Sequence, residues 1–546
     1  MELRIIIGGQ AGQGIQVISH LLSKAFVKVG YYVFNYRYYQ SLIKGGHNYN
    51  SIKVSDVPVF SHSEEEVDFI LALDQNTVNL HRKKLKEDGF IIADKRISAD
   101  RKIEVDVEKI LKNAGAEKIS ENIVLIATLW KALGLNKEIL KDTLKPKLGN
   151  ISEKIIDLVY EENIPILENK KIKIKEYRPR YYLTGSEAVA YGSIMAGLDI
   201  YLSYPMTPAT PVLHILASLK DKYNILVYQP DNEIGVINMA IGASYAGAKV
   251  MIGTSGGGFA LMTEALSLSG ISEIPIVIYV AQRYTPATGM ATHTLQGDLK
   301  FVLNAGHGEF PRIVIAPGDQ KEAIRRTIEA FYLSYKYNVP AIILSDLFLA
   351  ESACTFDNIE IPEIPIDRFL ELNPGNDYKL YKLTEEGYQR RAIPGTNSVI
   401  KASSYEHDEF GFTTEDPDIG KAMHEKRWRK MKYIEEEVRK LEPYKIYGSG
   451  SKLIISWGSN KLPILEALKE LKDWSYLHVS YISPFPKEIK NIIESYDTVV
   501  LVENNVTGLF GQVLREQTGI NIENKILKYN GGPFTAEEIK RRLLNM

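Results

Sequence analysis

Short apolar runs alternate with longer amphipathic stretches along most of the chain. Residues 3–7, LRIII, have the pattern of a buried strand, and residues 15–30 repeat apolar side chains at helical spacing. A glycine-rich turn, GGQAGQG, lies between them at residues 8–14. The pattern therefore predicts a strand, a glycine loop and a helix, and later runs such as DFILALD and GFIIAD continue the α/β alternation to about residue 165.

The alternation is clearest in the second region of the chain. Helical patterns there separate six apolar runs: DIYLSYP, ILVYQP, KVMIGTS, IPIVIYVAQR, RIVIAPGD and PAIILSDL. Buried strands that alternate with helices favour a largely parallel sheet covered on both faces, and ligands bind at the carboxyl ends of the strands in such a sheet. The predicted fold class is therefore α/β with several doubly wound domains.

The same pattern predicts where the chain divides. A lysine-rich stretch, ENKKIKIKEYRPR, predicts a linker around residues 168–180, and from about residue 355 the apolar runs stop and polar sequence leads to a helical stretch, HEKRWRKMKYIEEEVRKLEPY. The tail has Thr535 and Glu538 spaced as a capping box. The predicted domains are 1–180, a glycine-loop domain with the linker; 181–354, the second α/β domain; 355–445, an excursion and connecting helix; and 446–546, a third α/β domain.

Composition narrows the class of protein. A chain of 546 residues with 45% hydrophobic residues is expected to form several folded domains, and its net charge of −2 offers no overall field for nucleic acid or an anionic membrane. It lacks a run of roughly 18 apolar residues and a signal-peptide pattern, so we expect a cytoplasmic protein. The single cysteine, Cys354, excludes an internal disulfide and any cluster or zinc site that needs several thiolates from this chain.

The first glycine loop is a candidate anion site, because glycines let backbone amides approach an anion at a helix start. It does not match G-x-G-x-x-G, and no acidic residue follows about 20 positions later, so NAD is not expected. No acidic residue occurs between Glu2 and Asp56, but six basic ones do: Arg4, Lys24, Lys28, Arg37, Lys44 and Lys53. This charge suits a polyanion such as coenzyme A, and it equally suits a solvated basic face. The candidate coenzyme A residues are Gly9, Gly12, Gly14, Lys44, Gly45 and Gly46.

Two segments of the second region place polar residues beside predicted helices. In YLSYPMTPAT, Thr207 followed by Pro208 is typical of a helix start, with Thr at the N-cap and Pro at the first helical position. In QPDNEIGVINMAIGASYAGAK, Glu233 lies in the first turn of a helix that is otherwise small and apolar. An acid there favours the helix dipole. Because the helix should be buried, we expect Glu233 to be partly desolvated and suited to proton exchange with a buried base.

Two further segments follow predicted strands directly. Thr254, Ser255 and Gly256 open a glycine-rich turn before a helix, which predicts a ligand loop lined by backbone groups. Arg283 follows a fully apolar strand, where its guanidinium could clamp a carboxylate through paired hydrogen bonds. The alternative for Arg283 is a structural ion pair.

The order of these segments resembles that of the 2-oxoacid:ferredoxin oxidoreductases, specifically their large subunit, in which a gamma-type domain is fused ahead of an alpha-type part. The resemblance is carried by YPMTPAT, NEIGVINMAIGASYAGAK, TSGGGFALMTEA, QRYTPATGMAT, QGDL and GHGEFPRIVIAP, with GGQAGQG and KGGHN similar to the gamma part. EHDEFG, VENNVTGLFGQ and GGPFTAEEI extend it over nearly the whole chain. It implies a gamma-type domain, a pyrimidine-type domain of thiamine enzymes and a transketolase C-terminal-like domain.

The resemblance implies a thiamine diphosphate enzyme of the EC 1.2.7 type. Such an enzyme oxidatively decarboxylates a 2-oxoacid with coenzyme A to acyl-CoA and CO₂ and passes electrons singly to ferredoxin. It implies that Thr207 lies against substrate and cofactor, that Glu233 contacts the aminopyrimidine ring, and that Arg283 clamps the substrate carboxylate. Protonating that ring favours its imino tautomer, whose nitrogen can take the thiazolium C2 proton. The implied cofactor-binding residues are Tyr204, Pro205, Thr207, Glu233, Thr254, Ser255 and Gly256.

The chain lacks other parts that such an enzyme needs. Thiamine diphosphate is normally held through Mg²⁺ by Gly-Asp-Gly and a later Asn, whereas QGDL and PGDQ both lack the second glycine. We therefore expect a beta subunit to carry the Mg²⁺ and diphosphate motif and a [4Fe-4S] cluster, in an αβ or (αβ)₂ assembly, with no metal held by this chain. Tyr284-Thr285, Ala291 and TSGGGF depart from the family pattern, usually TSGPGF in the last case. The substrate stays open among pyruvate, 2-oxoglutarate and branched-chain or broad usage.

Two other functions are compatible with parts of the sequence. A non-catalytic partner subunit would keep the fold with a drifted site, and convergence of Thr207, Glu233 and Arg283 on one crevice distinguishes it from an enzyme. A stand-alone nucleotide-binding dehydrogenase is disfavoured by the missing fingerprint, and tight NADH binding by the isolated chain would support it.

Overall fold

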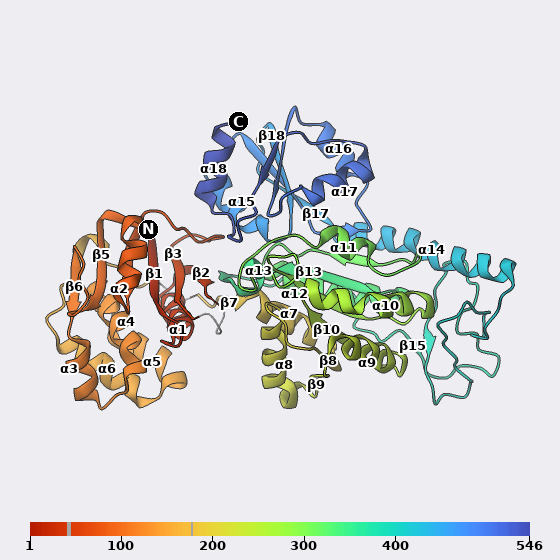
Figure 1. The fold of residues 1–546 in the computed structure, drawn as a ribbon, viewed down its shortest axis with the longest axis horizontal. Helices are drawn as coiled ribbons and strands as arrows, with labels where there is room; N and C mark the ends of the chain where they lie inside the picture. The colour runs from red at the N-terminus through yellow and green to blue at the C-terminus, as the bar shows by residue number, and fades with distance from the viewer. Residues whose placement is uncertain (41–44, 176–177) are drawn as a thin grey trace. The chain divides into compact units, whose positions relative to one another are not determined.

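The computed structural model describes residues 1–40, 45–175 and 178–546 (Figure 1). They form two compact units. The first unit comprises Met1–Leu183, Glu351–Asn358 and Thr535–Met546, and the second comprises Thr184–Ala350 and Ile359–Phe534. Segments 351–358 and 535–546 thus belong to the first unit, whereas the sequence analysis assigned all of their residues to the later domains. The finer boundaries of the four predicted domains stay a prediction.

The first unit is built on an eight-stranded mixed sheet of order β6-β5-β4-β1-β3-β2-β14-β7. β1 runs parallel to β4 and antiparallel to β3. The strands are β1 (Glu2–Gln10), β2 (Tyr32–Tyr38), β3 (His47–Ser55), β4 (Val67–Ala72), β5 (Leu85–Asp94), β6 (Lys102–Val105), β7 (Tyr181–Thr184) and β14 (Ala353–Phe356). The helices are α1 (Ile15–Lys28), α2 (Gln75–His81), α3 (Val107–Ala114), α4 (Glu121–Ala132), α5 (Lys137–Leu148), α6 (Asn150–Glu161) and α18 (Ala536–Leu544).

Two local predictions for this unit can be compared with the structure. β1 continues through Gly8 and Gly9, so the turn before α1 is shorter than the predicted glycine loop. At the other end of the chain, Thr535 caps α18 and its side chain accepts a hydrogen bond from the amide of Glu538 at 3.2 Å. The predicted Thr535 cap is present.

The second unit contains a seven-stranded sheet of order β20-β12-β13-β11-β10-β8-β9. Its strands are β8 (Ile200–Leu202), β9 (Leu226–Tyr228), β10 (Val250–Thr254), β11 (Val277–Gln282), β12 (Ile313–Ile315), β13 (Ala341–Asp346) and β20 (Tyr481–Ser483). All neighbours are parallel except β20, which pairs antiparallel with β12. The helices are α7 (Gly185–Met195), α8 (Thr210–Tyr223), α9 (Glu233–Tyr245), α10 (Gly256–Ser272), α11 (Leu299–Asn304), α12 (Gln320–Tyr337) and α13 (Leu347–Glu351). The predicted α/β class with a largely parallel sheet is confirmed here.

The rest of the second unit holds the polar excursion and a smaller sheet of order β17-β19-β18-β21-β22. The excursion contains the two-residue strands β15 (Leu370–Glu371) and β16 (Arg391–Ala392) and the helix α14 (Pro417–Lys440). α14 begins seven residues before the predicted helical stretch, because Asp416 caps it. The smaller sheet is formed by β17 (Tyr444–Tyr447), β18 (Lys452–Trp457), β19 (Trp474–Val479), β21 (Thr498–Glu503) and β22 (Lys525–Leu527), with α15 (Lys461–Leu468), α16 (Ile489–Glu494) and α17 (Leu509–Thr518).

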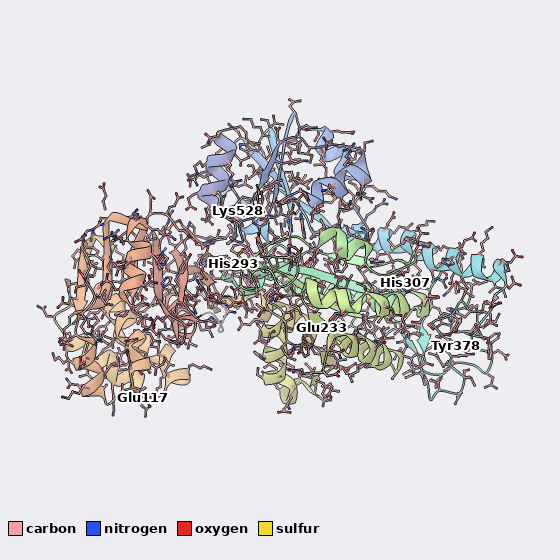
Figure 2. All side chains as sticks on the ribbon, in the orientation of Figure 1. Glu117, Glu233, His293, His307, Tyr378 and Lys528 are labelled. Carbon is pink, nitrogen blue, oxygen red and sulfur yellow. The ribbon has the colours of Figure 1, made fainter. Side chains whose placement is uncertain are left out.

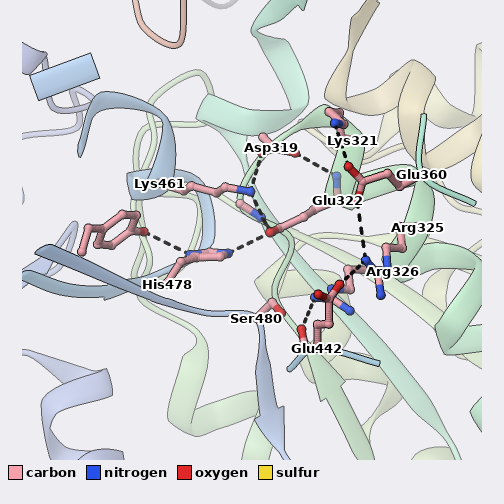
Figure 3. Close-up of polar contacts among 12 residues, drawn as sticks. Asp319, Lys321, Glu322, Arg325, Arg326, Glu360, Glu442, Lys461, His478 and Ser480 are labelled. Carbon is pink, nitrogen blue, oxygen red and sulfur yellow. Dashed lines mark hydrogen bonds and ion pairs between the residues drawn. The ribbon is translucent and has the colours of Figure 1, made fainter. Parts of the chain in front are cut away.

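A buried polar network connects the two sheets of the second unit (Figure 3). Glu322, in the first turn of α12, accepts hydrogen bonds from Lys461 Nζ at 2.7 Å and from the Gly318 amide at 2.8 Å. Its other contact is His478 Nε2 on β19, at 2.9 Å. Asp319, the N-cap of α12, also lies 2.5 Å from Lys461. These contacts fasten the start of α12 to the smaller sheet.

A second buried ion cluster anchors α14. Glu273, at the carboxyl end of α10, lies 2.6 Å from Lys426 Nζ and also contacts Lys430. All three side chains are buried. Burial alone would raise the pKa of the Glu273 carboxyl, but the charges of Lys426 and Lys430 lower it to about 2. Buried ion pairs of Glu273 with Lys426 and Lys430 therefore hold α14 against the end of α10.

Glu273→Gln should lower the free energy of unfolding by about 3–5 kcal/mol, because it leaves two buried ammonium groups without their counter-charge. The contribution of Glu273 is present above the pKa of an unfolded Glu and is lost as the pH falls towards about 2, because the folded-state pKa is the lower one. Denaturant unfolding of the full chain followed by circular dichroism measures both effects.

Glu425→Gln on α14 is the matched control, because Glu425 forms only an exposed pair with Lys421 at 3.9 Å. We expect that substitution to change the free energy of unfolding by less than about 0.5 kcal/mol. Equal effects of the two substitutions would contradict a special role for the buried cluster.

Candidate active site

The candidate site lies where parallel strands of the second unit end together. In β8, β10 and β11, Leu202 pairs with Ile252 and Thr254 pairs with Val280, so the three strands finish at one edge of the sheet. Ser203, just after β8, donates a hydrogen bond from Oγ to the Gly253 carbonyl at 2.7 Å, which holds the following loop against β10. The segments that carry Thr207, Ser255 and Arg283 therefore start from neighbouring points.

Thr207 lies in the loop after β8 and is half-buried. Its carbonyl accepts a hydrogen bond from Nη1 of Arg283 at 3.0 Å, so these two predicted site residues are in direct contact. The same motif places Tyr204 and Pro205 at the surface of the chain. Arg283 itself is half-buried and follows β11 directly, as the sequence indicates.

The prediction that Thr207-Pro208 starts a helix is wrong. α8 begins at Thr210, with Ala209 at the N-cap, and the Thr207-Pro208 peptide is cis. The carbonyl of Met206 accepts hydrogen bonds from the amides of Ala209 and Thr210, at 2.8 and 3.1 Å. These bonds close a separate turn ahead of the helix. The motif thus shapes a loop, which leaves the Thr207 carbonyl available to Arg283.

Glu233 is the first residue of α9 and is only 4% exposed (Figure 2). The side chain of Asn232 caps the helix by accepting a hydrogen bond from the Gly235 amide at 2.8 Å, so the helix does not need Glu233 as a cap. Its Oε1 would lie 2.7 Å from a Cβ added at Gly258, and Oγ1 of Thr254 would lie 2.2 Å from the same point. The predicted glycine-rich turn ahead of the helix is wrong, because Gly256, Gly257 and Gly258 are the first residues of α10. The start of α10 therefore packs directly against this acid, and the predicted desolvation of Glu233 agrees with its burial.

Asp298, in the QGDL segment, is a polar group of this region whose role the sequence did not predict. The side chain is 8% exposed, and a Cβ added at Gly256 would lie 2.3 Å from its Oδ2. Burial raises the pKa of the Asp298 carboxyl to about 6, although the charge of Arg283 acts to lower it. The signal in the sequence was an acid 15 residues after Arg283, in the QGDL segment, which was interpreted as part of the family resemblance and as an incomplete diphosphate motif.

The candidate coenzyme A residues lie in the first unit. The amide of Ala11 donates to the Gly46 carbonyl at 3.1 Å, so the two glycine turns predicted to act together are adjacent. Positive φ angles occur at Gly12, Gly14, Gly45 and Gly46, and Gly9 is a strand residue of β1. Lys44 lies outside the described residues.

The basic excess around these turns is partly neutralised. Arg4 and Lys53 both pair with Glu2, at 2.8 and 3.1 Å, and Arg37 pairs with Glu351 at 2.5 Å. Glu351 comes from a distant part of the chain, which is why the sequence pattern did not show the pairing. Three of the six basic residues therefore have local counter-charges.

No helix in the described part of the chain is long and apolar enough to cross a membrane. Among the same residues there is no group of three or more His, Cys, Asp or Glu side chains arranged to hold a metal ion.

Comparison with protein families identifies both parts of the chain. The family described as "Pyruvate flavodoxin/ferredoxin oxidoreductase, thiamine diP-bdg" matches residues 191–441, and "Pyruvate ferredoxin/flavodoxin oxidoreductase" matches residues 4–167. These matches define a 2-oxoacid oxidoreductase with a thiamine diphosphate-binding region. Within that class, the chain belongs to the 2-oxoacid:ferredoxin oxidoreductase family and is similar to its alpha subunits.

Individual relatives support this assignment. A 2-oxoacid:ferredoxin oxidoreductase subunit alpha from Sulfolobus sp is 32% identical over 100% of this chain and 97% of its own length. The 2-oxoglutarate oxidoreductase subunit KorA from Mycobacterium tuberculosis is 33% identical over 67% of this chain and 57% of its own length. The 2-oxoglutarate:ferredoxin oxidoreductase from Magnetococcus marinus, whose structure has 2-oxoglutarate, coenzyme A and succinyl-CoA bound, is 27% identical, covers 100% of this chain and 99% of its own, and superposes with a TM-score of 0.90.

The packing of the glycine turn yields a test with a built-in control. A methyl at Gly258 would overlap Thr254 and Glu233, whereas nothing lies within 4 Å of a methyl at Gly257. Gly258→Ala should cost about 1–3 kcal/mol of stability and displace Glu233, and Gly257→Ala should leave the chain's stability within about 0.5 kcal/mol of the parent. Thermal unfolding of the full chain compares them, and equal melting temperatures would refute the close packing.

Proposed function

We propose that this chain is the large subunit of a thiamine diphosphate-dependent 2-oxoacid:ferredoxin oxidoreductase. The reaction is the oxidative decarboxylation of a 2-oxoacid with coenzyme A to acyl-CoA and CO₂, with electrons passed to ferredoxin. The observation that carries the proposal is the contact of Arg283 with the Thr207 loop, on the same sheet edge that leads to Glu233. An anion-binding group and a buried acid are thereby brought to one region of a chain whose family binds thiamine diphosphate.

The residues present fit this cofactor. Glu233 is a buried acid at a helix start, and Gly258 leaves room beside its carboxyl group. Ser255 presents a buried hydroxyl that has no hydrogen-bond partner in the described part of the chain. We assign Tyr204, Pro205, Thr207, Thr254, Ser255 and Gly256 with Glu233 to the cofactor side of the site. When bound, thiamine diphosphate supplies a stabilised carbanion equivalent and an electron sink.

Each side chain of the site has a separate task. Glu233 would hold an exchangeable proton on its carboxyl group toward the aminopyrimidine ring, because a desolvated carboxyl can both donate and accept there. Arg283 binds the substrate carboxylate, for which its planar guanidinium offers two parallel donors. The Thr207 loop holds Arg283 in place through its carbonyl and presents the Thr207 hydroxyl to the substrate.

A beta subunit would complete the site. α9 and α10 lie side by side (Figure 1), and Ile234, Met239 and Leu261 on them are about half exposed. Such apolar side chains beside a catalytic acid suit a permanent partner. We assign the Mg²⁺ and diphosphate motif, the [4Fe-4S] cluster and delivery of electrons to ferredoxin to that partner. We assign coenzyme A to the two glycine turns of the first unit, which are adjacent to each other.

The proposed role of Glu233 is tested by Glu233→Gln, which keeps the shape and removes the exchangeable proton. In the complex reconstituted with a cysteine-bearing beta subunit, we expect the turnover number to fall by about 10²–10⁴-fold with the melting temperature unchanged. The assay is 2-oxoacid- and coenzyme A-dependent reduction of a low-potential one-electron acceptor. Normal turnover of this variant would remove Glu233 from the mechanism.

The proposed role of Arg283 predicts a different kinetic change. Arg283→Ala should raise KM for the 2-oxoacid by about 10–100-fold and change the turnover number less, because a charge-assisted pair worth about 1.5–3 kcal/mol is lost from substrate binding. Arg283→Lys keeps the charge without the paired geometry, so its KM for the 2-oxoacid should lie between that of the parent and that of Arg283→Ala. An unchanged KM in Arg283→Ala would assign this arginine to a structural ion pair instead.

A further inference from the structure

Asp298 is a buried acid that the proposed mechanism does not use. Its carboxyl oxygen Oδ2 has no hydrogen-bond partner in the part of the chain that the structure describes, and it lies against Gly256 at the start of α10. The neighbouring Ser255 Oγ is likewise buried without such a partner. A buried polar atom without a partner is costly unless a ligand or a proton completes it.

The backbone holds Asp298 firmly in this position. Its amide donates to Oε1 of Gln282 at 2.9 Å, and Nε2 of Gln282 donates to the Ser345 carbonyl at 3.1 Å. Gln282 is the last residue of β11 and directly precedes Arg283. Asp298 is therefore fixed to the same strand end that carries the proposed substrate clamp.

The charges around Asp298 are few. Arg283, from the end of β11, is the charged group that acts on its carboxyl, and Gly256 at the start of α10 packs against it. The acid Glu233 packs against the same helix start two residues further on, at Gly258. On the next strand, Asp346 is paired in register with Gln282, but its carboxyl is hydrogen-bonded to Ser459 Oγ at 2.6 Å and to the Leu349 amide at 3.0 Å. Asp298 is thus the acid placed to balance Arg283 before substrate binds.

We propose that Asp298 takes up one proton when a 2-oxoacid carboxylate binds to Arg283, so that substrate and proton bind together. The inference rests on the proposed function. Two carboxylates, one of them the buried Asp298, beside one half-buried guanidinium would leave a net negative charge in a partly desolvated site, which is unfavourable. Protonation of Oδ2 removes that charge, and it converts an unpaired acceptor into a hydrogen-bond donor. Asp298 is a positioning and specificity residue that favours one carboxylate at Arg283.

The pH dependence of substrate affinity tests this proposal. In the reconstituted complex, we expect KM for the 2-oxoacid to rise by up to about tenfold per pH unit between pH 6.5 and 8.5, because one proton is bound with each substrate. Asp298→Asn mimics the protonated acid, so its KM should stay near the low-pH value of the parent across this range. Asp221→Asn, an exposed residue on α8, should keep the parental profile.

Proton uptake provides a second readout that does not depend on turnover. Coenzyme A and the electron acceptor are omitted, and pyruvate or 2-oxoglutarate is mixed with the complex at pH 7.5 in weak buffer containing a pH indicator. We expect close to one proton taken up per site in the parent and none in Asp298→Asn. A parent that is active but shows the same pH profile and uptake as Asp298→Asn overturns this inference alone. A parent without any 2-oxoacid-dependent activity overturns the proposed function and the inference with it.

Discussion

The parallel pairing of β8, β10 and β11 is the constraint on which the site depends. In a parallel sheet all strands finish at the same edge, so segments separated by tens of residues begin their loops side by side. The register fixes this alignment, with Leu202 opposite Ile252 and Thr254 opposite Val280. Burial of the strands prevents a slip, because moving one strand by one residue would turn its apolar side chains the wrong way. Arg283 can therefore reach the Thr207 carbonyl without any local sequence signal for the contact.

The second unit treats its buried charges in two ways. Away from the site, two buried acids are surrounded by cations: Glu273 has two lysines, and Glu322 has Lys461 and a histidine. Near the site, Asp298 has an oxygen without a partner among the described residues. Paired charges stabilise the arrangement of helices and sheets, whereas an incompletely satisfied acid retains a response to whatever binds. The contrast separates the acids that hold the fold from Asp298, which we propose responds to a ligand.

Prediction from the sequence succeeded for elements that one strong local pattern marks. Apolar runs marked the strands of the larger sheet, and a guanidinium directly after such a run placed Arg283 at its carboxyl edge. The helix predicted at Pro208 failed because Met206 closes a separate turn, and the choice between two turns depends on tertiary contacts. β20 lies within the predicted third domain, yet it pairs with β12 of the larger sheet, because pairing across more than 160 residues leaves no local pattern. The counter-charge of Arg37 also comes from far along the chain. The periodicity of apolar residues indicates which side chains are buried, but it does not indicate which distant elements pack or pair with them.

The three glycines that begin α10 explain one departure from the family pattern. Gly256 leaves room for Asp298, and Gly258 leaves room for Glu233 and Thr254. A methyl group at Gly256 would collide with the Asp298 side chain, and one at Gly258 would collide with Glu233 and Thr254. The packing therefore requires glycine at the first and third glycine positions of TSGGGF. The middle residue, Gly257, is exposed with nothing within 4 Å of an added Cβ. A proline ring fits there, because the first turn of a helix needs no amide donor. The change from TSGPGF to TSGGGF therefore alters the one position of the turn that touches neither acid, and it leaves the proposed chemistry of both acids intact.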